Sequence, residues 1–101
     1  MNTIKNIKNS IDSFIIEYED SSLNLKSYTD SKNIYVDITN LNLINSIKTA
    51  ILTSTYCFLN DFQKNICWMV KDIEIKKSIS ILCLKNTKCI VAGELLAKEI
   101  A

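Results

Sequence analysis

A strand, a helix and a second strand follow one another within residues 33–72, and this order most constrains the fold of the chain. Residues 34–39 alternate apolar and polar side chains, which predicts a β-strand with one buried face. Residues 66–70 are apolar on both faces, as is typical of a strand in the middle of a parallel sheet covered by helices. Strands joined by a helix in this way pair in parallel through a right-handed crossover. The stretch therefore predicts the centre of an α/β sheet.

The helix between these two strands begins between Leu43 and Ser46 and ends near Leu59. Its first turn contains polar side chains with a simple structural role, because Asn45 or Ser46 would cap the free N–H groups there. A stripe of side chains at helical spacing is expected to pack against the sheet. The members of this stripe are Leu43, Ile47, Ala50, Ile51, Ser54, Cys57 and Phe58.

The opposite face of this helix carries fewer charges than a face in contact only with solvent would. The residues along it are Lys48, Leu52, Tyr56 and Leu59, with three threonines beside them. A tyrosine among aliphatic side chains is typical of a protein-binding surface, and both a homodimer interface and a different partner protein are compatible with it. Scattered apolar residues on an ordinary surface are the alternative interpretation.

Weaker patterns on either side extend this unit into a single domain. Residues 1–12 are a poorly defined lead-in or a short helix. Residues 23–28 are favoured as a short helix that follows an acidic and serine-rich run, although Leu23 and Leu25 also alternate as in a strand. The other predicted elements are a strand at residues 13–17, a helix at 73–84 capped by Asp72, a strand at 88–92 and a helix at 94–101. Residues 1–101 are thus expected to form one α/β sandwich with about four mostly parallel strands and helices.

The charge of the chain argues against nucleic acid as a partner. The formal net charge is +1, and all twelve basic residues are lysines. Nucleic-acid recognition favours a basic surplus and the bidentate guanidinium group of arginine. The apolar runs are too short for a membrane span, and the N-terminal residues lack the apolar core of a signal peptide. A cytoplasmic protein is therefore expected.

No residue constellation in the sequence demands an enzyme. The chain contains no histidine, and no serine or cysteine lies in a recognisable nucleophile motif or glycine-rich loop. Its four cysteines are spaced without a close pair of the kind that structural zinc sites use, so neither a metal centre nor a cofactor is expected. They are Cys57, Cys67, Cys83 and Cys89. Small apolar side chains are the favoured interpretation of these cysteines, and a thiol or redox enzyme is the alternative.

Residues 37–46 read Asp-Ile-Thr-x-Leu-x-x-Ile-Asn-Ser and resemble the core motif of the STAS domain, the family of sulfate transporters and anti-sigma-factor antagonists. In that family a strand ending in Asp-Leu-Ser is followed by an apolar pair and by Asp-Ser-Ser-Gly at the start of a helix. The order of elements agrees over residues 34–101. This copy departs from the motif in having Asn45 in place of Asp, Ile47 in place of the phosphorylated second Ser and Lys48 in place of Gly.

The resemblance implies a non-enzymatic bacterial regulatory domain that binds another protein. The implied partner is a signalling kinase, a component of a sigma-factor system or a transporter. Ser46 matches the first serine of the motif and is a candidate phosphorylation site, because a helix N-terminus favours a phosphate group. The expected partner-binding residues are Asn40, Asn42, Asn45, Ser46, Lys48, Leu52 and Tyr56. The alternative function is that of a small phage or mobile-element protein that inhibits an enzyme by docking on it.

Overall fold

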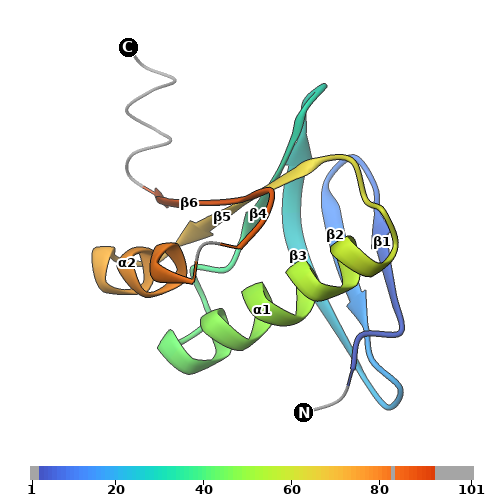
Figure 1. The fold of residues 1–101 in the computed structure, drawn as a ribbon, viewed down its shortest axis with the longest axis horizontal. Helices are drawn as coiled ribbons and strands as arrows, with labels where there is room; N and C mark the ends of the chain where they lie inside the picture. Colours follow the sequence, from blue (N-terminus) through green and yellow to red (C-terminus); the bar gives the residue numbers. More distant parts are fainter. Residues whose placement is uncertain (1–2, 83, 93–101) are drawn as a thin grey trace.

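The computed structural model describes residues 3–82 and 84–92, which form one six-stranded sheet and two helices (Figure 1). The strands are β1 (Asn6–Asn9), β2 (Ser13–Glu17), β3 (Ser22–Thr29), β4 (Asn33–Asp37), β5 (Asn65–Val70) and β6 (Thr87–Val91). The helices are α1 (Leu43–Leu59) and α2 (Ile73–Ile81). Figure 1 shows both helices on the same side of the parallel strands. Neither of these helices is long and apolar enough to cross a membrane.

The strands lie in the sheet in sequence order, from β1 at one edge to β6 at the other. Strands β1 to β4 are antiparallel neighbours, whereas β4, β5 and β6 are parallel and are connected through α1 and α2. Strand β3 joins the two parts, because residues 22–26 pair with β2 and residues 27–29 pair with β4. The predicted α/β class is confirmed. The prediction of about four mostly parallel strands is wrong, since most of the pairings are antiparallel.

The first third of the chain accounts for this difference. Residues 23–28 lie within β3 and not in a short helix, and part of the lead-in forms β1. The burial of β3 alternates, with Leu25 and Ser27 buried and Lys26 exposed, which is the period of a strand. The acidic and serine-rich run before it forms a turn, in which the Tyr18 backbone N–H donates a hydrogen bond to the Ser21 carbonyl at 2.8 Å. Pairing with β2 and β4 therefore decides the conformation of this segment.

The core lies between the sheet and the helices. Trp68 in β5 is its largest fully buried side chain, and the ring of Phe14 from β2 meets it edge-on with 6.2 Å between the ring centroids. The predicted inward face of β4 is confirmed, because Ile34 and Val36 in the strand and Ile38 directly after it have no exposed surface. The other buried hydrophobic members of this cluster are Ile4, Ile16, Leu25, Ala50, Ile66, Val70, Ile75 and Ile79.

The predicted bounds of the long helix are confirmed, and the predicted buried stripe is confirmed in part, because Ala50 is buried and Leu43, Ile47 and Cys57 are partly buried against the core. The buried side chains of α1 are Ser46, Thr49, Ala50 and Thr53. By contrast, Ile51 and Phe58 of the predicted stripe are 37% and 70% exposed. Small side chains allow a helix to approach a sheet closely, which accounts for the full burial of Thr49 and Thr53, whereas the bulkier Leu43 and Ile47 are only partly buried against the core.

The two helix starts are fixed by side-chain caps. The Asn42 Oδ1 atom accepts a hydrogen bond from the Asn45 backbone N–H at 2.8 Å, so Asn42 caps α1 in place of the predicted Asn45 or Ser46. The predicted cap of α2 is confirmed, because Asp72 Oδ1 accepts from the Ile75 backbone N–H at 3.0 Å. Strand β6 corresponds to the strand predicted at residues 88–92. The helix predicted at residues 94–101 lies outside the described residues, and so does Cys83.

Candidate protein-binding surface

The connection from β4 to α1 forms a corner, residues 37–42, that is held by its own polar side chains. Asp37 Oδ1 accepts hydrogen bonds from the Thr39 backbone N–H at 2.9 Å and from the Thr39 hydroxyl at 2.7 Å. The Leu41 backbone N–H donates to the Ile38 carbonyl at 3.0 Å. These bonds turn the chain sharply after the strand without a glycine. The corner therefore presents the amide of Asn40 to solvent on a locally stabilised loop.

A hollow of about 440 Å³ lies beside this corner. On one side it is lined by the turn between β2 and β3, and on the other by the corner and the first turns of α1. Its lining residues are Tyr18, Asp20, Ser21, Ser22, Leu23, Leu41, Asn45 and Thr49. Burial raises the pKa of Tyr18, so its phenol stays protonated at neutral pH and can donate a hydrogen bond. Hydroxyl, amide and phenol groups around two leucines suit a polypeptide surface that offers both apolar and hydrogen-bonding groups.

The structure brings together only part of the predicted partner-binding set. Asn40 and Asn42 are exposed at the corner, Asn45 is exposed in the first turn of α1, and Lys48 is exposed one turn further along the helix. Leu52 and Tyr56 are half-buried further along the helix. The Tyr56 hydroxyl donates to Asn6 Oδ1 in β1 at 3.2 Å, and Leu52 and Tyr56 line a small hollow together with residues 3–5. Tyr56 thus ties α1 to β1, which is a structural role.

Ser46 differs from the other corner residues because its side chain has no exposed surface. Its hydroxyl donates to the Leu41 carbonyl at 3.4 Å, beneath the first turn of α1. A kinase could reach this oxygen only if the start of the helix opened. Phosphorylation of Ser46 stays a prediction, and in the folded conformation Ser46 contributes nothing to the surface of the corner.

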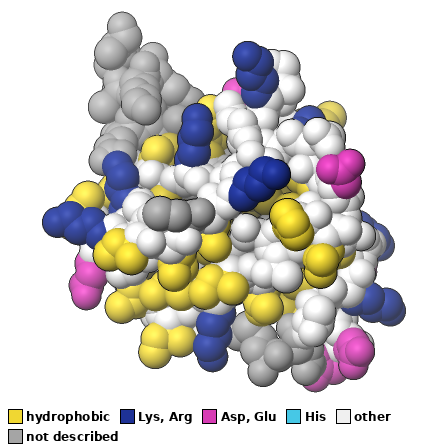
Figure 2. Space-filling model, viewed as in Figure 1, with side chains coloured by type: hydrophobic (Ala, Val, Ile, Leu, Met, Phe, Trp, Pro, Cys, Tyr) yellow, Lys and Arg dark blue, Asp and Glu magenta, His cyan; other side chains and the backbone are white. Residues whose placement is uncertain are grey.

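The structure shows a second surface feature, which includes two residues, Ile51 and Phe58, that the sequence analysis assigned to the core. The helix layer, meaning the outward faces of α1 and α2, exposes large hydrophobic side chains (Figure 2). Their exposed fractions are 62% for Ile44, 37% for Ile51, 70% for Phe58, 73% for Leu59, 52% for Ile73, 78% for Ile81 and 39% for Leu82. The spacing of seven residues between Ile44, Ile51 and Phe58 was the signal for this surface, since it marks one line along a helix.

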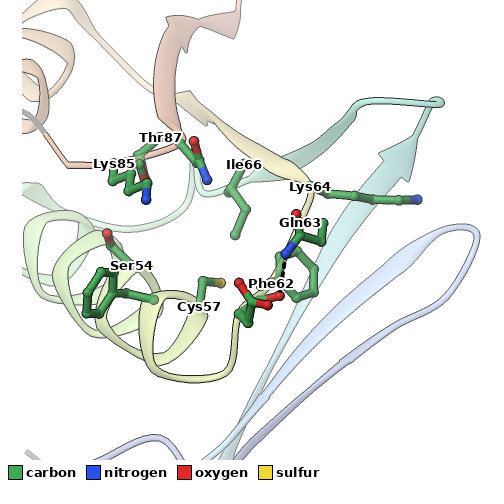
Figure 3. Close-up of a pocket in the computed structure, with 11 residues that line it drawn as sticks. Ser54, Cys57, Phe62, Gln63, Lys64, Ile66, Lys85 and Thr87 are labelled. Carbon is green, nitrogen blue, oxygen red and sulfur yellow. Dashed lines mark hydrogen bonds between the residues drawn. The ribbon is translucent and has the colours of Figure 1, made fainter.

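A cleft of about 170 Å³ lies at the opposite end of α1 from the corner (Figure 3). Burial raises the pKa of Cys57 in this cleft to about 11, so the group is a protonated thiol at neutral pH and not a nucleophilic thiolate. Lys85 Nζ lies 5.9 Å from the centroid of the Phe58 ring, and Gln63 Nε2 donates to the Asp61 carbonyl at 3.0 Å. The cleft therefore offers no activated thiol.

In residues 3–82 and 84–92, no three side chains of His, Cys, Asp or Glu gather at one place in an arrangement that could hold a metal ion. A scan against models of known protein families finds no match, and searches of curated proteins and of solved structures find none either.

Proposed function

We propose that this protein is a non-enzymatic, STAS-like regulatory domain of the cytoplasm that acts by binding another protein through the corner after β4. The observation that carries the proposal is the hollow beside the corner, where the exposed amide of Asn45 and the hydroxyl groups of the β2–β3 turn line the same hollow as Leu23 and Leu41. Contacts of this kind, with an apolar centre and a hydrogen-bonding rim, are those that protein–protein interfaces use.

The position of the hollow agrees with the resemblance to the STAS domain. Residues 37–46, which carry that resemblance, form the corner and the first turn of α1. The partners that the resemblance implies are a signalling kinase, a component of a sigma-factor system or a transporter. Because Ser46 is buried and Ile47 occupies the position of the phosphorylated serine, we propose a constitutive binder and not a phosphorylation switch.

Affinity capture from a lysate of the source organism tests the proposal. The wild-type protein is compared with Asn45→Lys, which places a charged side chain at the hollow. We expect one partner to be recovered by the wild type and its recovery to fall by roughly tenfold with the variant, which corresponds to about 1.4 kcal/mol of binding free energy. Asn24→Lys is the matched control, because Asn24 is exposed on β3 and does not line the hollow.

Equal recovery by Asn45→Lys and the wild type would contradict the proposed surface, provided that circular dichroism shows both proteins folded. The identity of a partner that depends on Asn45 also decides the class of protein. A signalling kinase or an anti-sigma factor would support a regulator. A nuclease or a polymerase would instead support the alternative of a docking inhibitor.

A further inference from the structure

The cleft at the C-terminal end of α1 combines an apolar floor with charged and polar side chains around it. Three parts of the chain form it, namely the last turns of α1, the loop between α1 and β5, and the turn that enters β6. Ile66 of β5 projects into the cleft and is only 3% exposed (Figure 3). An apolar floor with a few polar groups around it is the usual composition of a small-molecule site.

Backbone hydrogen bonds fix the walls of this cleft. The Phe62 N–H donates to the Cys57 carbonyl at 2.9 Å, which folds the loop back onto the end of α1. The Ile66 N–H donates to the Asn86 carbonyl at 2.9 Å and fastens the turn before β6 to β5. Asp61 and Asn86 have φ angles of 52° and 56°, a left-handed conformation that Asp and Asn adopt more readily than most residues. The fold therefore forms the cleft without the help of a ligand.

Two side chains of opposite charge, Asp61 and Lys85, line the cleft without pairing with each other. Neither forms an ion pair with another residue in the part of the chain that the structure describes. Lys85 Nζ lies 5.9 Å from the centroid of the Phe58 ring, a contact that holds its ammonium group beside the cleft. Lys64 also belongs to the lining, but its side chain extends away from the cleft (Figure 3). A ligand that carries both an ammonium and a carboxylate group can pair with both protein charges.

The volume of the cleft limits the size of the ligand. It is about 170 Å³, close to the roughly 150 Å³ of a cavity that binds benzene and below the roughly 300–1,000 Å³ of sites for drug-sized molecules. Burial raises the pKa of Cys57 to about 11, so its uncharged thiol extends the apolar floor. An apolar body of about six non-hydrogen atoms is therefore of the right size.

We propose that this cleft binds a small amino acid with an apolar side chain. The side chain lies against Ile66 and Cys57, the carboxylate group pairs with Lys85, and the ammonium group pairs with Asp61. The cleft and the corner are at opposite ends of α1, so this proposal is independent of the proposed partner-binding surface.

Nuclear magnetic resonance titration of the full chain tests the class of ligand. Norleucine is compared with hexanoate, which is the same molecule without the ammonium group, and with pentylamine, which lacks the carboxylate. We expect norleucine to shift the amide signals of residues 57–66 and 85–87 to saturation. The other two molecules should bind at least about tenfold more weakly, because each leaves one protein charge without a partner. Absence of saturable shifts with norleucine would overturn the proposal, and so would equal binding of all three molecules.

Two variants test the role of each charge. Lys85→Gln and Asp61→Asn should each weaken norleucine binding by about tenfold. Lys85→Gln should leave pentylamine binding unchanged, and Asp61→Asn should leave hexanoate binding unchanged, because each of these ligands lacks the group that the substituted residue would contact. Lys88→Gln is the matched control, because Lys88 is exposed on β6 and does not line the cleft. Unchanged norleucine binding in Lys85→Gln or in Asp61→Asn would overturn the proposal.

Discussion

Replacing Trp68 with alanine is expected to lower the free energy of unfolding by about 3–5 kcal/mol. Trp68 is only 1% exposed, lies in the strand between β4 and β6 and packs edge-on against Phe14. Its removal leaves a cavity in the core where the antiparallel and parallel parts of the sheet share one hydrophobic cluster. Because small domains are stable by only about 5–15 kcal/mol, a loss of this size brings the protein close to unfolding. Urea denaturation followed by circular dichroism measures the change.

Phe58→Ala provides the control for this prediction, because it also removes an aromatic ring but from a side chain that is 70% exposed. We expect Phe58→Ala to change the free energy of unfolding by no more than about 0.5 kcal/mol. If Trp68→Ala cost no more than this control, the placement of Trp68 at the centre of the core would be wrong.

Thr53→Val is expected to stabilise the protein by about 1–2 kcal/mol. Thr53 has no exposed surface, and its hydroxyl oxygen has no hydrogen-bond partner among the described residues. Burying a hydroxyl without a partner is unfavourable, and valine keeps the branched shape while it removes the polar atom. The midpoint of thermal or urea unfolding should therefore rise.

Thr55→Val is the matched control for this second substitution. Thr55 is exposed on the same helix, and its hydroxyl donates to the Ile51 carbonyl at 2.9 Å, so we expect its replacement to change stability little. A loss of stability in Thr53→Val would show that the hydroxyl has a partner in solution.

The segments predicted correctly from the sequence are those whose local pattern agrees with their place in the fold. The alternation of Ile34 and Val36 in β4, continued by Ile38 directly after the strand, matches the buried face. In α2 a single carboxylate, Asp72, both signals and caps the helix start. For these elements local preference and tertiary packing agree, so the sequence pattern is sufficient.

Strand β3 was missed because its local pattern supports two structures. The run of acids and serines before it suits a helix start as well as a turn, and only pairing with β2 and β4 distinguishes the two. The face of α1 was predicted only in part for a related reason. Apolar periodicity correctly identified Ala50, but it also selected Ile51 and Phe58, which are exposed, and it missed the buried Thr49 and Thr53. Packing distance between layers is not encoded in periodicity.

The candidate site was predicted in part. Of the three asparagines that the sequence analysis selected, Asn40, Asn42 and Asn45, all are exposed, but only Asn45 lines the hollow. Most of the other lining residues lie in residues 18–23, which are far away in sequence and were interpreted as belonging to another element. Separation along the chain also explains why the structural role of Tyr56 was not predicted, because its hydrogen-bond partner Asn6 lies 50 residues earlier. Local patterns cannot show contacts of this kind.

Hydrogen–deuterium exchange of the protein alone and in complex with its captured partner tests the central claim most directly. The proposed function predicts slower exchange on binding in the two segments that form the hollow, residues 18–23 and 39–49. Peptides from β1 should exchange at the same rate in both samples, because β1 does not line the hollow. Protection confined to β1, or to the C-terminal half of α1 with no change at the corner, would contradict the assignment of the corner as the binding surface.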